Sequence, residues 1–177
     1  MDAIFLKDIE VKLICALMRN CRKSDRELAK LVGVSQPTVS RIRTRFEKEG
    51  VIRYTGAADL TKLGYDIIAI TFGNWKHARY PDIKKPRIKD FFTKHPNIIF
   101  ASTGRGPNSD RVSISVHKTY SDYSAFIREL RSDWGEHWAL TESFLLSIKS
   151  DNVIRPLSLA YLAECLEKER SEKRLET

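Results

Sequence analysis

The sequence predicts an α+β protein that joins an N-terminal winged-type helix-turn-helix domain to a C-terminal ferredoxin-like βαββαβ domain with an added C-terminal helix. Three observations predict this arrangement. Residues 8–50 carry the apolar spacing and capping residues of three short helices. Residues 66–150 follow the order strand, helix, strand, strand, helix, strand. A further helical pattern begins near Leu157 and becomes charged after Glu167.

The predicted domain boundaries follow the changes in apolar period. They are a helix-turn-helix domain at 1–54, a connector at 55–65, a ferredoxin-like domain at 66–156, and a C-terminal helix with a charged tail at 157–177. The connector contains no Gly/Ser-rich run, so we expect it to join the two halves stiffly.

The composition is that of a globular protein with an excess of positive charge. The chain has 177 residues, 42% hydrophobic and 31% charged, a net charge of +8 and a pI near 9.5. Such a charge favours a polyanionic partner, because contacts to phosphates release counterions. No apolar run approaches the ~20 residues of a membrane span, and no signal-peptide core is seen, so we expect a cytoplasmic protein without a membrane partner. Cys15, Cys21 and Cys165 lack metal-ligand spacing and are expected to be reduced thiols.

Capping signals delimit the three N-terminal helices. The first helix ends near Asn20. Ser24 and Glu27 form a predicted capping box at the start of the second helix, and Gly33 stops it. Ser35 is a good N-cap for the third helix, which runs to Glu49. The next four residues, 51–54, are predicted to form a short strand.

The third helix has one apolar face and one basic, polar face. Val39, Ile42 and Phe46 recur at spacings of three and four, and polar residues occupy the opposite side. A helix that is capped, held by an apolar seam and basic outside is typical of a recognition helix in the major groove of double-stranded DNA. The alternative is a small helical domain with a solvated charged face. The candidate DNA-contacting residues are Ser35, Gln36, Thr38, Ser40, Arg41, Arg43, Thr44, Arg45, Lys48 and Arg53.

These candidates are expected to differ in role. Arg41 and Arg45, one turn apart, are predicted to reach guanine edges or the backbone, whereas Lys48 and Arg53 are better placed for phosphates. Arg43 lies near the apolar edge and is expected to reach sideways to the backbone of a partner.

The second half alternates strands with amphipathic helices. Val112, Ile114 and Val116 are predicted to point inward from a half-buried strand, and Tyr123, Phe126, Ile127 and Leu130 from a helix. The predicted strands are 66–72, 98–103, 111–117 and 139–150, the helices are 88–94 and 121–134, and a turn is expected at 104–108.

Several motifs resemble the leucine-responsive regulator (Lrp/AsnC) family of transcription regulators. They are Leu6–Glu10, Arg26–Ala29, Val32–Ser35, Val39–Ile42, Glu49–Arg53 and Lys62–Tyr65. The resemblance is specific over residues 6–72 and continues more weakly to about 150. It implies a regulatory and dimerisation domain after the helix-turn-helix, a homodimer or larger oligomer, and often an amino acid as effector. Lys7 departs from the aspartate with which the family usually caps the first helix.

The family's effector signature is a short glycine-acid turn, which is longer and more basic here. Bare backbone amides in such a turn can face a carboxylate, and Arg105 can pair with it. An ordinary hairpin turn is the alternative. The candidate effector residues are Thr103, Gly104, Arg105, Gly106, Ser109 and Asp110.

No catalytic set, metal site or cofactor motif is recognised, so the sequence predicts no enzyme and no cofactor. Two alternatives remain open. Siroheme decarboxylases are similar to this family in both domains, although His77 and Tyr80 match their aromatic and histidine stretch poorly. The other alternative is an interaction module without DNA, in which Leu159, Leu162, Ala163 and Leu166 form a packing face within one chain or between subunits.

Overall fold

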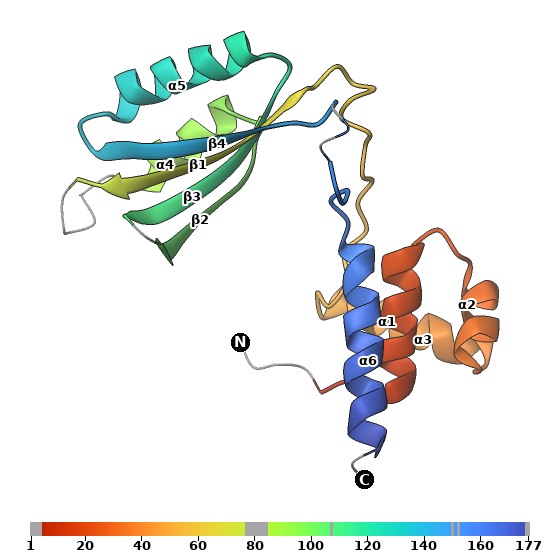
Figure 1. The fold of residues 1–177 in the computed structure, drawn as a ribbon. Coiled ribbons are helices and arrows are strands. Elements are labelled where there is room, and N and C mark those ends of the chain that lie inside the picture. Colours follow the sequence, from red (N-terminus) through yellow and green to blue (C-terminus); the bar gives the residue numbers. More distant parts are fainter. Residues whose placement is uncertain (1–4, 77–84, 107, 150, 152, 176–177) are drawn as a thin grey trace. The chain divides into compact units, whose positions relative to one another are not determined.

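The chain divides into two compact units. The structure, a computed structural model, describes residues 5–76, 85–106, 108–149, 151 and 153–175 (Figure 1). One unit consists of residues 1–57 together with 155–177, and the other of residues 58–154. Within the described ranges, no helix combines the length and apolar character needed to cross a bilayer.

The N-terminal half of the first unit contains the three predicted helices. They are α1 (Asp8–Arg19), α2 (Asp25–Val32) and α3 (Gln36–Lys48). The Ser24 amide donates to the Glu27 carboxylate at 2.7 Å, and the Glu27 amide donates to the Ser24 hydroxyl at 3.3 Å, which confirms the capping box. Gly33 ends α2 with φ +78°, a conformation that glycine adopts without strain. The core between the helices is made of Leu13, Leu17, Leu28, Ala29, Val32, Val39, Ile42 and Phe46.

A C-terminal helix returns to the same unit and covers a second face of α1. A short 3₁₀ turn (Leu159–Tyr161) leads into α6 (Leu162–Leu175). Val11 and Cys15 of α1 are buried against Ala163, whose carbonyl accepts from the Cys15 thiol at 3.5 Å. Figure 1 shows the two helices side by side. The packing predicted for Ala163 and Leu166 is therefore within one chain.

Ion pairs hold α6 along the length of α1. The Arg19 guanidinium meets the Glu167 carboxylate at 2.6 Å, and the Arg170 guanidinium lies 3.0 Å from the Asp8 carboxylate. Arg170 also donates to the Leu6 carbonyl. These pairs join the start and the end of α1 to the C-terminal segment.

Two predictions about this unit were wrong in detail. Residues 51–54 form no strand, because the Val51 amide donates to the Phe46 carbonyl at 2.8 Å and so completes the end of α3. The C-terminal α-helix begins at Leu162 rather than near Leu157, and it extends beyond Glu167. Leu159 and Leu162 are exposed, so the packing predicted for these two side chains is not formed within the chain.

The second unit is a four-stranded antiparallel sheet with two helices, as predicted. Its strand order is β2-β3-β1-β4, the ferredoxin-like arrangement. The helix α5 buries Tyr123, Phe126, Ile127 and Leu130, which confirms its inner face. The elements are β1 (Ile67–Trp75), α4 (Lys85–Lys94), β2 (Ile98–Gly106), β3 (Ser109–His117), α5 (Tyr120–Trp134) and β4 (Trp138–Ser147).

The face of the sheet toward the helices carries small and polar residues beside the apolar Leu145 and Ile98. Ala69 of β1 packs among the α5 side chains, and its cross-strand neighbour on β3 is Ser115. Ser115 and His117 are buried on this face, where the Ser115 hydroxyl lies 2.8 Å from His117 Nε2. Burial lowers the pKa of His117 below its ordinary 6.5, more than the nearby Asp122 raises it, so its neutral form is favoured.

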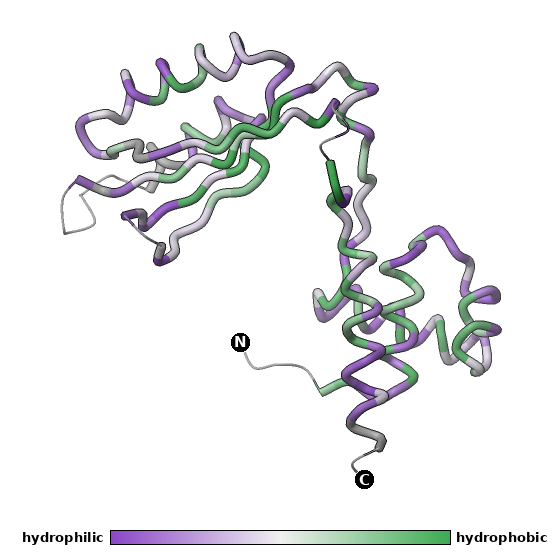
Figure 2. Tube along the Cα trace, in the orientation of Figure 1, coloured by the Kyte–Doolittle hydropathy of each residue, from purple (hydrophilic) through white to green (hydrophobic). Residues whose placement is uncertain are grey.

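The apolar residues of the strands point to the other face. Because side chains alternate along a strand, Val112, Ile114 and Val116 lie opposite Ser115, so the prediction that they point toward the helices was wrong. Figure 2 shows the hydrophobic stretches along the strands. The pairing places on this open face Ile68, Ile70 and Phe72 of β1, Phe100 of β2, and Phe144 and Leu146 of β4.

The hairpin between β2 and β3 is tighter than the predicted turn at 104–108. The strands continue until Gly106 pairs with Ser109, and Asn108 adopts φ +57°. A left-handed residue permits a short connection between antiparallel strands, so most of the predicted turn becomes strand.

Gly73 gives a test of the packing at the end of β1. A Cβ atom at Gly73 would overlap the Trp138 indole, whereas one at Gly104 would meet nothing within 4 Å. We therefore expect Gly73→Ala to lower the free energy of unfolding by about 1–3 kcal/mol. The matched Gly104→Ala is expected to change it by less than about 0.5 kcal/mol. Urea unfolding of both variants checks this, and equal effects would contradict the packing described.

Candidate nucleic-acid interface

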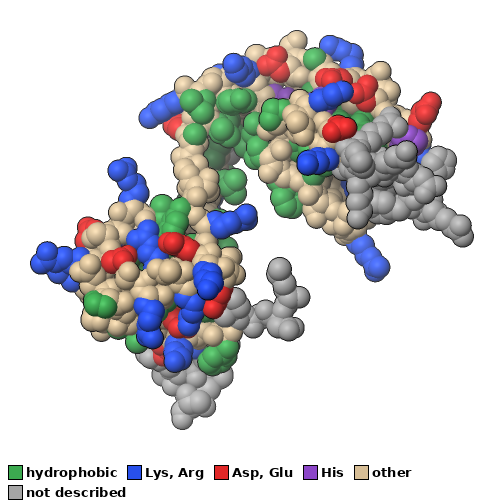
Figure 3. Space-filling model, turned by 180° about the vertical axis from the view of Figure 1, so that it is seen from behind, with side chains coloured by type: hydrophobic (Ala, Val, Ile, Leu, Met, Phe, Trp, Pro, Cys, Tyr) green, Lys and Arg blue, Asp and Glu red, His purple; other side chains and the backbone are tan. Residues whose placement is uncertain are grey.

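The exposed face of α3 is the candidate interface. Val39, Ile42 and Phe46 are buried beneath it. At about 100° per residue, five exposed residues fall on the opposite side. They are Gln36, Ser40, Arg41, Thr44 and Lys48. Within the part of the chain that the structure describes, these five side chains make no hydrogen bond or ion pair. Figure 3 shows Lys and Arg side chains spread over the visible face of this unit, with acidic side chains among them.

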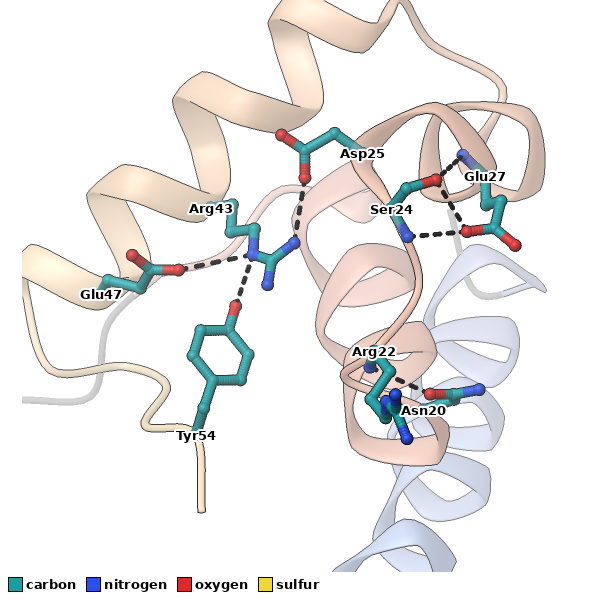
Figure 4. A network of polar contacts seen from close by, with 8 residues as sticks. All are labelled: Asn20, Arg22, Ser24, Asp25, Glu27, Arg43, Glu47 and Tyr54. Atoms are coloured by element: carbon teal, nitrogen blue, oxygen red, sulfur yellow. Dashed lines mark hydrogen bonds and ion pairs between the residues drawn. The ribbon is translucent and has the colours of Figure 1, made fainter. Parts of the chain in front are cut away.

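Arg43 holds one edge of this face against α2. Its guanidinium lies 3.1 Å from the Asp25 carboxylate and donates from Nε to the Tyr54 hydroxyl at 2.8 Å (Figure 4). Glu47, one turn on, adds a carboxylate at 3.4 Å. Burial lowers the pKa of Arg43, but the bonds to Asp25 and Tyr54 outweigh this and raise the pKa above its ordinary value, so the group stays charged. Arg43 thus serves its own domain rather than reaching outward.

Arg45 holds the opposite edge against the start of α1. Its guanidinium lies 2.7 Å from the Glu10 carboxylate, and Glu10 is only 6% exposed. Glu10 also accepts from the Lys7 amide at 2.9 Å, so it satisfies a backbone donor where Lys7 supplies no capping acceptor. A weaker contact of 3.7 Å joins Arg45 to Glu49.

The N-terminal turn of α3 is organised by its own hydroxyls. Ser35 is the N-cap, as predicted, and accepts from the Thr38 amide at 3.4 Å. The two hydroxyls lie 2.8 Å apart. Both predicted DNA-contacting residues are therefore engaged with each other, and Gln36 lies exposed beside them.

The structure separates the predicted contact residues into two groups. Arg43 and Arg45 flank the face and pair with carboxylates of the same domain, whereas Arg41 and Lys48 lie on the face itself. Arg53 is exposed beyond the end of α3. Sequence reasoning missed the partners Glu10, Asp25 and Tyr54. The one available signal was an acid at residue 10, among the apolar positions of α1.

The amino-acid sequence is similar to those of known DNA-binding regulators. A model described as winged helix-turn-helix DNA-binding matches residues 6–53. An uncharacterised HTH-type transcriptional regulator of Pyrococcus furiosus is 26% identical over 152 residues, which are 85% of this chain and 99% of that protein. The regulator LrpC of Bacillus subtilis is 32% identical over 96 residues, which are 54% of this chain and 63% of LrpC.

Solved structures share the fold of both units. The structure of B. subtilis LrpC has a TM-score of 0.66 at 24% identity, covering 86% of this chain and 100% of LrpC. The relatives and solved structures that match this chain include regulators of the Lrp/AsnC family. A transcriptional regulator of Neisseria meningitidis, solved as a complex with L-Met, has a TM-score of 0.70 at 13% identity and covers 88% of this chain and 96% of its own.

In this chain the predicted effector turn is an exposed hairpin end. Thr103 and Gly106 are drawn into cross-strand pairs with Arg111 and Ser109. Residues 103–106 are exposed, among them Gly104 and Arg105, and Asp110 is half-buried beside the Arg111 guanidinium, 3.9 Å from its Nε. Effector binding at this turn stays a prediction.

The Glu10–Arg45 pair makes stability depend on pH. Burial raises the pKa of Glu10, but the Lys7 amide and the Arg45 guanidinium together lower it below its ordinary 4.5. A carboxylate with a lowered pKa stabilises the fold above its unfolded pKa, and this contribution is lost as the pH falls through the folded value. Glu10→Gln is therefore expected to cost about 1–2 kcal/mol at neutral pH and little in acid.

Glu49 provides the matched control, because it contacts the same guanidinium from an exposed position. Glu49→Gln is expected to change stability by less than about 0.5 kcal/mol at any pH. Denaturant unfolding across the acid range measures both variants. A Glu10→Gln penalty that does not shrink in acid would refute the role given to the ion pair.

Proposed function

We propose that this regulator binds double-stranded DNA with sequence specificity through Gln36, Ser40, Arg41, Thr44 and Lys48 on the exposed face of α3. One observation carries the proposal. The two arginines at the edges of the face, Arg43 and Arg45, are tied inward, and the residues between them are left free of intradomain bonds among the described residues. A helix held in this way presents hydrogen-bonding groups at little entropic cost.

Within this face the roles divide by chemistry. The guanidinium of Arg41 can donate two parallel hydrogen bonds to the edge of a guanine base. Lys48 and Arg53 are suited to phosphates, Lys48 through its ammonium charge and Arg53 through its guanidinium. Ser35 and Thr38, bonded to each other, act mainly by shaping the helix start. Arg45 and Arg43 act by orienting α3, and Arg45 is 43% exposed, so it can also present charge to the backbone.

We assign dimerisation to the open face of the sheet. Phe100, Phe144 and Leu146 are 51%, 59% and 37% exposed there and adjoin apolar residues of β1 and β3. A continuous apolar sheet face of this kind is stabilised by burial against a second surface. A second copy of the chain supplies a surface of the same character, and two recognition helices then read a palindrome.

A small-molecule effector is part of the proposal. The regulator of N. meningitidis was solved with L-Met, and its fold matches both units of this chain. We place the protein in the cytoplasm because its proposed partner is DNA. We assign no catalysis to it: the free basic face of α3 has a use in DNA binding and none in a decarboxylase. His77 and Tyr80, the residues that bear on that alternative, lie outside the described residues.

Arg41 tests the recognition face. Arg41→Ala is expected to weaken binding to a specific operator fragment by about 1–3 kcal/mol, because a bidentate base contact is lost. Thermal stability should not change, since Arg41 is exposed. Lys48→Ala should weaken binding to all sequences and reduce the salt slope by about 1. Fluorescence anisotropy on upstream DNA, with unrelated competitor DNA and a salt series, measures both.

Arg128 is the matched control for this experiment. It is an exposed arginine on α5, in the other unit, and Arg128→Ala is expected to leave DNA affinity unchanged. Wild-type affinity in the Arg41→Ala and Lys48→Ala single variants and in their double variant would remove the assignment of α3 as the reading helix.

Phe144 tests the dimer face. Phe144→Asp places a charge on the apolar surface and is expected to weaken self-association by about 2 kcal/mol or more, so that monomer accumulates at low concentration. Tyr120→Asp is the control, because Tyr120 is 65% exposed but lies on α5, away from the open face. Sedimentation velocity distinguishes the species, and a dimer unaffected by Phe144→Asp would place the interface elsewhere.

A further inference from the structure

The second unit contains a cavity that the proposed DNA and dimer surfaces do not use. It has a volume of about 440 Å³ and lies between the sheet and the helices α4 and α5. Cavities of about 300–1,000 Å³ hold most small ligands of proteins. The open face proposed for dimerisation is the opposite face of the sheet, so a ligand here need not compete with a second copy of the chain.

The space exists because the floor is made of small residues. Ala101 of β2 and Ser113 of β3 are cross-strand neighbours on the floor, and Gly73 at the end of β1 leaves room for the Trp138 indole. Large side chains reach in from the helices instead, so the volume between them and the floor stays open.

Aromatic rings form the walls of this cavity. Phe91 of α4 and Trp134 of α5 meet edge to face with ring centroids 5.3 Å apart. Phe126 from α5 and Trp138 from β4 also line it. Flat apolar walls of this kind favour an aromatic ligand, because offset and edge-to-face ring contacts add to the burial of apolar surface.

A single charged residue is found among the described lining residues, and it is a cation. Arg111 is 17% exposed and lies next to Thr103 across the β2–β3 pair, with the Ser113 hydroxyl two residues on. Its Nε also lies 3.9 Å from the Asp110 carboxylate, which is outside the cavity lining. A guanidinium beside hydroxyl groups is suited to a carboxylate, and no lining acid among the described residues would pair with an ammonium group.

We propose that this cavity binds a small aromatic carboxylic acid without an α-ammonium group, with its ring against the wall formed by Phe91, Trp134 and Trp138 and its carboxylate on Arg111. The proposal deepens the effector part of the proposed function and rests on it for any regulatory role, whereas the binding step is independent of DNA. It also places the effector next to the exposed hairpin, in a site that shares Thr103 with it.

Three probes of the same shape test the ligand class by titration calorimetry on the full chain. Indole-3-acetate carries the ring and the carboxylate, indole-3-acetamide is its neutral counterpart, and L-tryptophan adds the ammonium group. Indole-3-acetate is expected to bind at least tenfold more tightly than either of the others. Absence of binding by indole-3-acetate, phenylacetate and phenylpyruvate at millimolar concentration, or equal binding of the amide, would overturn the proposal.

Variants then separate the cavity from the hairpin. Arg111→Gln and the cavity-filling Ser113→Leu are each expected to weaken indole-3-acetate binding at least tenfold. The exposed Arg105→Gln is the control and should leave it unchanged. Loss of binding in Arg105→Gln, or its retention in both cavity variants, would place the ligand at the hairpin instead.

Two further measurements keep the test tied to folded protein. Circular dichroism melting shows whether each variant is folded, and an unfolded Arg111→Gln leaves Ser113→Leu and the amide probe to decide. DNA affinity without ligand is measured in parallel, because loss of DNA binding with intact ligand binding counts against the proposed DNA function and not against the cavity.

Discussion

The recognition helix depends on the pairing of its two edge arginines with carboxylates on other helices. Arg45 meets Glu10 at the start of α1, and Arg43 meets Asp25 at the start of α2. Apolar packing alone determines how closely a helix lies against its neighbours. It constrains rotation of the helix about its axis only weakly, because apolar contacts have little directionality. Charge-assisted hydrogen bonds on both sides restrict that rotation. The exposed face of α3 is therefore presented in one orientation, as reading a DNA groove requires.

Glu10 links this constraint to the rest of the unit. It accepts from Lys7 and from Arg45, and the same helix is packed on its far side by α6. Asp8, at the first position of α1, pairs with Arg170 of α6. Helix α1 is thus buried on two sides, by the core of the three helices and by the C-terminal segment.

In the sheet of the second unit, most large apolar side chains lie on the open face and not on the face that the helices cover. Small and polar residues such as Ala69, Ser113 and Ser115 face the helices, and apolar residues face away. The strand period predicted which residues share a face, but not which face is covered, because alternation is symmetrical. The large residues of α4 and α5 meet small residues on the sheet, so this layer keeps a cavity, while the other face leaves large apolar side chains exposed.

The sequence by itself determined the limits of the helices α2 and α3 and the order of strands and helices along the second unit, because the signals for these are local. Ser24, Gly33 and Ser35 act within one helical turn, and strand alternation acts within a few residues. Only the tertiary structure decided which carboxylate meets Arg45, 35 residues away, and that α6 covers α1, with 148 residues between Cys15 and Ala163. Those contacts are set by packing through space. The basic face predicted a DNA-binding helix-turn-helix, whereas the fold was needed to show that Arg43 and Arg45 pair with carboxylates of their own unit and that, among the described residues, Arg41 does not.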